Sequence, residues 1–226
     1  MKIEIFPQTE KTTVGEYVYD VLKMNIVRMK LEPGNRISEN EISELLGVSR
    51  TPVREAFIKL SREGLLYVLP QRGTYVAKID LDQVEEARFM REVLESAVLK
   101  LVTKGISDEY LDRLDANLEE QRKCLMTRDL SRYYELDEAF HRIIFESVNK
   151  LRTWIVIDQV NTQYKRVRIL SYSFDNMINS LIDQHAQLAE AIRQKNDEKA
   201  QLVIGNHIRK LIHEQADLKV RYPNYF

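Results

Sequence analysis

The sequence has few of the residues that build cross-linked or loop-rich proteins. Its 226 residues include one cysteine, Cys124, which excludes an intramolecular disulfide framework and a cysteine-based zinc finger. Seven glycines and five prolines are too few for a loop-heavy all-β protein, so long helices are expected. No apolar run approaches the roughly 18 residues that span a bilayer, and the N-terminus has no signal-peptide pattern. These absences predict a soluble, cytoplasmic protein with no membrane partner.

The chain also lacks an excess of charge of either sign. It contains 34 Lys and Arg against 35 Asp and Glu, a formal net charge of −1, so the whole molecule is not a basic protein of the kind that binds polyanions. Hydrophobic residues make up 44% and charged residues 31%, a composition that favours a packed core over disorder. At about 150 residues per domain, the length indicates one large domain or two small ones.

The first 78 residues carry the signals of three short helices followed by a hairpin. Apolar residues at helical spacing, with turn or capping residues between them, predict helices over 13–29, 38–46 and 49–62. Two β-prone runs around a glycine-containing turn predict a hairpin over 65–76. Elements in this order predict a winged helix-turn-helix, and the alternative is a generic three-helix subdomain.

The polar residues of the third predicted helix favour DNA binding. Arg50, Thr51 and Arg54 crowd its N-terminal turn, while apolar residues occupy the opposite face. A recognition helix presents its N-terminal residues to base edges in the major groove. There an arginine can bridge O6 and N7 of guanine, and a threonine can meet a base or a phosphate. These three residues are therefore candidate DNA contacts.

From Leu81 onward the sequence carries only helical patterns. Weak breaks at five places divide this part into about six helices, enough for an antiparallel bundle with its own core. The expected fold class is mainly α. An N-terminal winged helix-turn-helix domain with a small β-hairpin wing is expected over 1–78, and a C-terminal all-α antiparallel bundle over 79–226.

Three histidines and one aspartate lie on apolar helix faces of this C-terminal part. Asp137 and His141 stand four residues apart and share one face of a helix, and His185 and His207 each lie in an apolar stripe. A single histidine on such a face is usually a satisfied core residue, but burying all four groups costs several kcal/mol unless they find partners. A shared divalent metal ion is the economical partner, and zinc, nickel, iron and manganese all suit the set. The fourth histidine, His213, is expected at the surface.

Residues 13–78 resemble the DNA-binding domain of GntR-type bacterial transcription regulators. The resemblance rests on ISENEISELLGVSRTPVREAFIKLSREGLLYVLPQRGTYV, in which SRTPVREA and RGTYV are specific to that group. It implies that the three candidate contacts touch DNA and that Gly73, at the wing tip, approaches the minor groove. Many relatives carry an arginine where this chain has Asn40, which implies a weaker or different phosphate or base contact there.

Residues from about 82 to 217 resemble the all-helical effector domain called FCD, found in the FadR-like branch of the same family. ELDEAFHRIIFESVNK matches its D-x-x-F-H motif, and QHAQLAEAIRQKNDEKA with the later NHI matches its second half. The resemblance implies that a metal ion facing a cavity is bound by Asp137, His141, His185 and His207. Many members carry an acid where this chain has Gln184, which implies different outer support for the ligands. Six helices fit the VanR-like subdivision better than FadR itself.

The sequence FMREVLESA matches the R-x-x-x-E of the domain's first helix with Arg91 and Glu95. The match makes Arg91 a candidate for binding an effector carboxylate through two parallel hydrogen bonds. The alternative is an i,i+4 salt bridge between Arg91 and Glu95 on a solvated helix face. The two interpretations stand equal on the sequence.

Together these residues and resemblances predict a ligand-responsive transcription regulator, not an enzyme. We expect a homodimer, because one recognition helix reads only half of a pseudo-palindromic operator in double-stranded DNA. The effector would be a small organic acid that ligates the metal ion, and repression with release by the ligand is the commoner arrangement in relatives. One alternative is a metal sensor, in which the ion itself is the signal. Another is a metalloenzyme in which the ion activates water, but no convincing general base lies near the ligands.

Overall fold

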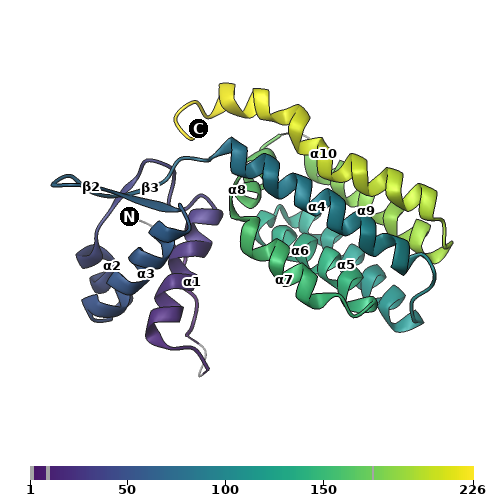
Figure 1. Ribbon diagram of the computed structural model, residues 1–226, viewed down its shortest axis with the longest axis horizontal. Coiled ribbons are helices and arrows are strands. Elements are labelled where there is room, and N and C mark those ends of the chain that lie inside the picture. The colour runs from purple at the N-terminus through teal and green to yellow at the C-terminus, as the bar shows by residue number, and fades with distance from the viewer. Residues whose placement is uncertain (1–2, 9–10, 175) are drawn as a thin grey trace. The chain divides into compact units, whose positions relative to one another are not determined.

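The computed structural model describes residues 3–8, 11–174 and 176–226, apart from the side chain of His213, so the expectation for His213 falls outside the described residues. The described residues form ten helices and one three-stranded antiparallel sheet, labelled in Figure 1. Contacts divide the chain into two compact units, Met1–Leu81 with Asp217–Phe226, and Asp82–Ala216. This architecture confirms the expected fold class, which is mainly α with a small sheet as the wing.

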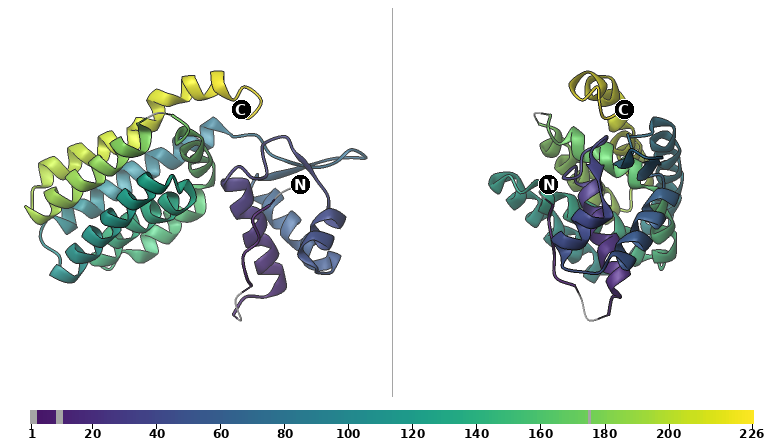
Figure 2. Two further views of the ribbon diagram at one scale, coloured as in Figure 1. Left: turned by 180° about the vertical axis from the view of Figure 1, so that it is seen from behind. Right: turned by 90° about the vertical axis from the view of Figure 1, so that its left-hand side faces the viewer.

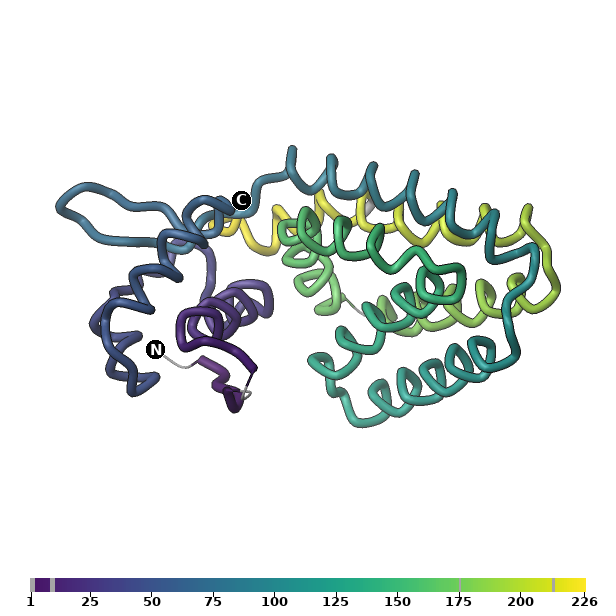
Figure 3. Tube along the Cα trace, turned by 60° about the horizontal axis from the view of Figure 1, so that its bottom comes forward, coloured from purple at the N-terminus to yellow at the C-terminus, as the bar shows by residue number. Residues whose placement is uncertain are grey.

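The first unit is a winged helix-turn-helix built from three helices and the sheet. Its elements are α1 Val14–Val27, β1 Arg36–Ile37, α2 Glu39–Leu46, α3 Arg50–Arg62, β2 Leu66–Leu69 and β3 Gly73–Val76. The strands pair antiparallel in the order β1-β3-β2, with Leu69 opposite Gly73 at the end of the hairpin. Figure 3 shows the β2–β3 hairpin extending away from the helices of this unit. Strand β1 is not predicted from the sequence, because two residues carry no hydrophobic period.

Apolar side chains of α1, α3 and the sheet form the core of this unit. Five completely buried members are Val18, Leu22, Val53, Leu60 and Val76. Because these contacts draw one face of α3 inward, the N-terminal turn of α3 keeps its polar side chains exposed. The last residues of the chain also belong to this unit, where the N–H of Ile79 donates to the carbonyl of Tyr225 at 2.7 Å.

The second unit is a bundle of helices. Its elements are α4 Leu81–Val102, α5 Asp108–Thr127, α6 Leu130–Ser147, α7 Leu151–Val160, α8 Thr162–Ser171, α9 Met177–Arg193 and α10 Asp197–Arg221. Helix α5 packs against α6 and α9, and α6 packs against α7, around a shared apolar core. Figure 2 shows from behind how α4, α9 and α10 run alongside one another in this unit. No helix in the described part of the chain is long and apolar enough to cross a membrane.

The number of helices in this region differs from the expected six. Seven are present, α4–α10, because a segment predicted as one helix is divided into α7 and α8 at Asn161. Asn161 (φ −90°, ψ 6°) interrupts the helix with no glycine or proline beside it, so no local signal marks the break. The expectation of six helices is therefore wrong, and helix number gives no support to the VanR-like subdivision.

Candidate metal centre and DNA-reading surface

Four side chains from three helices of the second unit meet at one point. Asp137 and His141 come from α6, His185 from α9 and His207 from α10. Each offers one ligand atom, and these atoms all lie within 4.8 Å of one another. Asp137, His141 and His185 are completely buried, and His207 is 8% exposed. The structure thus brings together all four residues that the sequence marks as candidate metal ligands.

A side-chain oxygen lies close to the outer nitrogen of each histidine. The Nδ1–oxygen distances are 2.7 Å for His141 and Glu95, 2.9 Å for His185 and Gln121, and 3.1 Å for His207 and Gln184. On the inner side, Nε2 of His141 lies 3.2 Å from Nε2 of His207. An imidazole that donates its Nδ1 proton keeps the Nε2 lone pair for a metal ion. The two amide oxygens thereby favour the metal-binding tautomer in His185 and His207, while Glu95 lies within ion-pair distance of Nδ1 of His141.

Asp137 is held by Arg168 of α8. The guanidinium of Arg168 donates to Oδ2, while Oδ1 lies 3.7 Å from Nε2 of His185. Burial by itself raises the pKa of Asp137, but the charges around it, above all that of Arg168, bring the pKa below its usual value. Asp137 therefore enters the centre as an ionised carboxylate.

Three buried atoms of the four candidate ligands have no hydrogen-bond partner among the described residues: Oδ1 of Asp137, Nε2 of His185 and Nδ1 of His141. An unsatisfied buried polar atom costs about 1–3 kcal/mol. A divalent cation satisfies Oδ1 of Asp137 and Nε2 of His185 at once, and three imidazoles with one carboxylate suit such an ion. Burial lowers the pKa of His185 to about 3 and the pKa of His207 well below its usual value, so both rings are neutral near pH 7, as metal ligands must be. The residues present fit a metal site.

Arg91 and Glu95 form the i,i+4 salt bridge that the sequence allows, but not on a solvated face. Nε of Arg91 lies 2.7 Å from Oε1 of Glu95, and the two side chains are 1% and 3% exposed. Burial raises the pKa of Glu95, but Arg91 and His141 outweigh burial and lower it to about 2. Nη2 of Arg91 has no hydrogen-bond partner among the described residues. The buried arginine therefore keeps one donor beside the metal centre.

Sequence reasoning misses most of the outer partners of the centre. Gln121 is 64 residues from His185, and Arg168 is 31 residues from Asp137. No spacing rule connects residues so far apart in the chain. Glu95 does carry a signal, as the acid of the R-x-x-x-E match, but the sequence does not show that it contacts a ligand.

The candidate DNA contacts gather at the N-terminal turn of α3 and the adjoining hairpin. Arg50, Arg54 and Gly73 line one surface hollow of about 280 Å³, which Asn40 also lines. Thr51 is exposed in the same turn of α3. The side chains of Arg50 and Arg54 are 64% and 70% exposed, so their donors are accessible to bases or phosphates.

Two further residues of this hollow, Arg36 and Glu39, are not marked by the sequence. Oε2 of Glu39 lies 3.4 Å from Nη2 of Arg50, and its Oε1 lies 3.6 Å from Nε of Arg54. The Arg36 side chain covers Gly73 (φ +112°), where an added Cβ would lie 2.8 Å from Nε of Arg36. Three arginines and one carboxylate therefore line this hollow.

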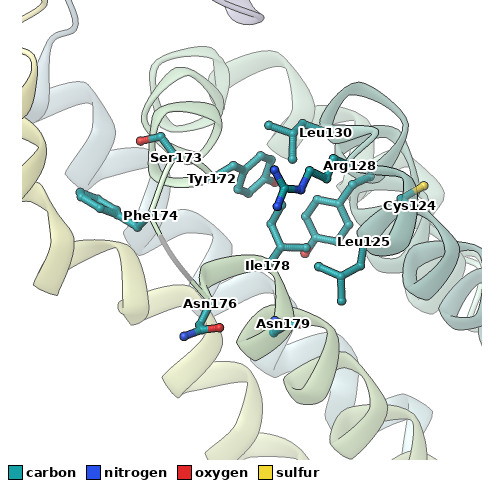
Figure 4. A pocket seen from close by; sticks show the side chains of 11 residues that line it. Cys124, Leu125, Arg128, Leu130, Tyr172, Ser173, Phe174, Asn176, Ile178 and Asn179 are labelled. Carbon is teal, nitrogen blue, oxygen red and sulfur yellow. The ribbon is translucent and has the colours of Figure 1, made fainter.

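A second hollow, of about 330 Å³, lies in the second unit beside two tyrosine rings. Figure 4 shows its lining, which includes Arg128 and Tyr172. Tyr172 packs edge to face on Tyr133, with 5.2 Å between the ring centroids, and Nη2 of Arg168 lies 3.3 Å from its hydroxyl. The two tyrosines thus stand between this hollow and the arginine that holds the carboxylate of the metal centre.

Comparison with known proteins agrees with both parts of this geometry. Residues 15–76 match the family described as bacterial regulatory proteins, gntR family. Residues 86–210, more than half of the chain, match the FCD domain. The chain belongs to the GntR family. As a GntR-family protein with an FCD domain it is a transcription regulator, which confirms the expectation that it is not an enzyme.

Relatives of this GntR-family chain match nearly its whole length. It is 30% identical to the HTH-type transcriptional repressor RspR of Escherichia coli over 213 residues, 94% of this chain and 93% of that protein. It is 26% identical to the gluconate operon transcriptional repressor of Bacillus licheniformis, over 82% of this chain and 78% of that one. The solved structure of E. coli McbR/YncC has the same fold, with a TM-score of 0.76, 22% identity, and coverage of 93% of this chain and 99% of that one.

Proposed function

We propose that this regulator is a repressor whose affinity for its operator is controlled by a small organic acid bound at a metal ion in the FCD domain. One observation carries the proposal. A carboxylate and three imidazoles converge in a buried centre, and a further side chain holds each of them from outside. We assign DNA reading to residues 1–78, and effector binding and dimerisation to residues 79–226.

On the DNA side, α3 enters the major groove of double-stranded operator DNA with Arg50, Thr51 and Arg54 at the base edges. The hairpin with Gly73 approaches the minor groove. One such head reads half of a pseudo-palindromic site, so the protein acts as a homodimer. We propose that the protein is cytoplasmic, because a regulator that binds operator DNA must share a compartment with that DNA.

On the effector side, a divalent ion would be held by Asp137, His141, His185 and His207. Zinc, nickel, iron and manganese all suit these ligands. When bound, the ion supplies positive charge and, where it takes more than four ligands, open positions for a carboxylate. Arg91 donates to the same carboxylate through Nη2, the atom that has no partner among the described residues.

Helix α10 gives the effector a covalent route to the DNA-binding unit. The helix carries His207, and residues 217–226, which include its last turn, belong to the first unit. There the carbonyl of Tyr225 accepts from the N–H of Ile79, close to the start of α4. A ligand that favours one position of α10 thereby biases the DNA-binding state.

The names of two relatives support the proposals that this protein is a repressor and that its effector is an organic acid. RspR and the Bacillus licheniformis protein are both named transcriptional repressors, and the second is named for a gluconate operon. Gluconate is a carboxylate that also carries hydroxyl groups, so it belongs to the class of ligand that a metal ion and an arginine can bind together.

Thermal unfolding tests the proposal directly. The metal-loaded protein is unfolded with each of a panel of small carboxylates that includes gluconate, and with the uncharged polyol sorbitol as a matched control. A ligand at 100 times its Kd adds about 2.7 kcal/mol, which raises the midpoint at roughly 2–4 °C per kcal/mol for a chain of this size. We expect one acid to raise the midpoint, sorbitol to leave it unchanged, and chelation to abolish the shift.

The same experiment separates the proposal from its alternatives. If no acid shifts the midpoint while chelation alone lowers it, the organic-acid effector is wrong. The ion is then the signal itself or a purely structural part of the bundle, and loss of DNA binding on chelation identifies the metal sensor.

A further inference from the structure

Helix α4 leaves an apolar row uncovered on the outer side of its bundle. Phe89 is 60% exposed and Val93 is 49% exposed, and Ala97 is exposed as well. These residues follow one another at steps of four, so they lie on one side of the helix. The other side of α4 carries Arg91 and Glu95, which are buried at the metal centre. Figure 3 shows α4 at the edge of the bundle.

Charges of opposite sign stand at the two ends of this row. Glu86 comes three residues before Phe89, Lys100 comes three residues after Ala97, and both are exposed. Steps of three and four keep all five residues on one face of the helix. We call Glu86, Phe89, Val93, Ala97 and Lys100 the α4 seam.

The α4 seam is complementary to itself about Val93. Phe89 and Ala97 lie four residues to either side of Val93, and Glu86 and Lys100 lie seven residues to either side. In an antiparallel pair with both Val93 side chains on the two-fold axis, each Phe89 faces the Ala97 of the other copy. Each Glu86 likewise faces the Lys100 of the other copy. Large side chains then meet small ones and acids meet bases, whereas a parallel pair would set like charges together.

We propose that the α4 seam binds a second copy of this chain, with the two α4 helices antiparallel across a two-fold axis at Val93. This inference rests on the homodimer of the proposed function and names its surface. An acid near the start of a helix and a base near its end also suit the helix dipole. The dipole gives no reason, however, for the exposed Phe89 and Val93 between them. Because Glu95 lies on the same helix and contacts His141, a ligand at the metal centre acts on the helix that forms the dimer.

Charge exchange on the seam tests this pairing. In Glu86→Lys and in Lys100→Glu, two like-charged pairs replace two oppositely charged ones, and we expect the dimer Kd at low salt to rise roughly tenfold in each variant. An equimolar mixture of the two variants should recover dimers, because each chain then meets the opposite charge on its partner. The double variant should dimerise like the unchanged chain. Analytical ultracentrifugation of the full-length proteins over a range of concentrations measures the dimer Kd of the single variants, of their mixture and of the double variant.

Two valines of equal exposure provide a matched control. Val93→Asp places two carboxylates at the two-fold axis and should abolish the dimer at micromolar concentrations. Val156→Asp on α7, at a position 48% exposed against 49% for Val93, should leave the dimer intact. Circular dichroism verifies that both variants keep their helices, since both positions are exposed.

The outcomes separate the seam from the homodimer itself. Loss of the dimer in Val93→Asp, with recovery in the mixture of charge variants, supports the α4 seam. A dimer that persists in Val93→Asp, or a mixture no more dimeric than its components, overturns the seam and leaves the homodimer standing. An unchanged chain that is monomeric at every concentration instead overturns the homodimer of the proposed function.

Discussion

Two kinds of oxygen lie beside the three histidines of the candidate metal centre. Nδ1 of His141 lies 2.7 Å from a carboxylate oxygen of Glu95, whereas the other two rings hydrogen-bond to the amides of Gln121 and Gln184. A carboxylate partner makes an imidazole a stronger ligand than an amide does, because its negative charge favours a cation on the ring. Gln184 places an amide oxygen against Nδ1 of His207 where a carboxylate oxygen would also fit, so the metal affinity is expected to depend on this position.

Substitutions of Gln184 should change the metal affinity in opposite directions. Gln184→Ala removes the acceptor for Nδ1 of His207, so the ring loses its fixed orientation and the affinity should fall by about 10–100-fold. Gln184→Glu offers a carboxylate in the same place and should raise the affinity. Competition with a chromophoric chelator measures both changes. Gln184 is half-buried, so the bundle should tolerate either side chain.

Gln194→Ala is the control for this pair. Gln194 follows directly after α9 and bonds to Glu190 instead of a ligand, so its loss should leave the metal affinity unchanged. If Gln184→Ala keeps the metal affinity of the unchanged protein, or if Gln194→Ala lowers the metal affinity by the same amount, Gln184 does not orient His207.

At the scale of elements, α3 separates the residues that hold the fold from the candidate DNA contacts. Val53 and Leu60 are completely buried in the core of the first unit, while Arg50 and Arg54 reach into the hollow beside the hairpin. Glu39 of α2 lies between the two arginines, within 3.6 Å of each. The candidate DNA contacts can therefore be changed without opening the core.

Arg54→Ala should cost about 1–3 kcal/mol of specific binding, because one contact between an arginine and a base is lost. The probe is a duplex that the unchanged protein selects from random sequences, and fluorescence anisotropy at fixed salt measures the affinity. Arg62→Ala removes the same charge from the last turn of α3 and should cost much less. Equal losses of duplex affinity in the two variants would mean that Arg54 contributes only its charge. An unchanged duplex affinity in Arg54→Ala would mean that Arg54 is not a DNA contact.

Local signals account for which elements are predicted and which are not. The predicted helix over 13–29 is α1, Val14–Val27, whose start is marked by a capping box of Thr13 and Glu16. The hairpin is predicted because a glycine-containing turn separates two β-prone runs. The break at Asn161 is missed because the helical pattern continues across it and no glycine or proline stands beside it.

At the scale of the whole molecule, the candidate metal centre and the candidate DNA-reading turn lie in different units of one chain. The coupling proposed between them must be reciprocal, because linked binding equilibria change each other's affinity by the same factor. If an acid found by thermal unfolding lowers the affinity for the selected duplex, that duplex must lower the affinity for the acid by the same factor. Factors of about 5–150 are typical. Calorimetric titration of the acid, with the selected duplex, with a scrambled duplex and without DNA, measures the second factor. If the selected duplex lowers the affinity for the acid by a different factor from the one by which the acid lowers the affinity for the duplex, the two ligands are not coupled through one equilibrium.

The sequence by itself determined the winged helix-turn-helix, the helical character of the remainder, and the residues that could ligate a metal ion. Each of these rests on neighbours within about one helical turn, where caps, periods and i,i+4 spacing have fixed geometric consequences. The family motifs then tied Asp137 and His141 to two histidines much farther along the chain.

Only the tertiary structure decided what surrounds those residues. It placed Glu95, Gln121 and Gln184 against the three histidines and Arg168 against Asp137, and it buried the Arg91–Glu95 pair that the sequence left between two interpretations. It also left the α4 seam uncovered. These outcomes depend on how helices distant in sequence pack together, and no local pattern encodes which polar side chain will meet which partner across a core.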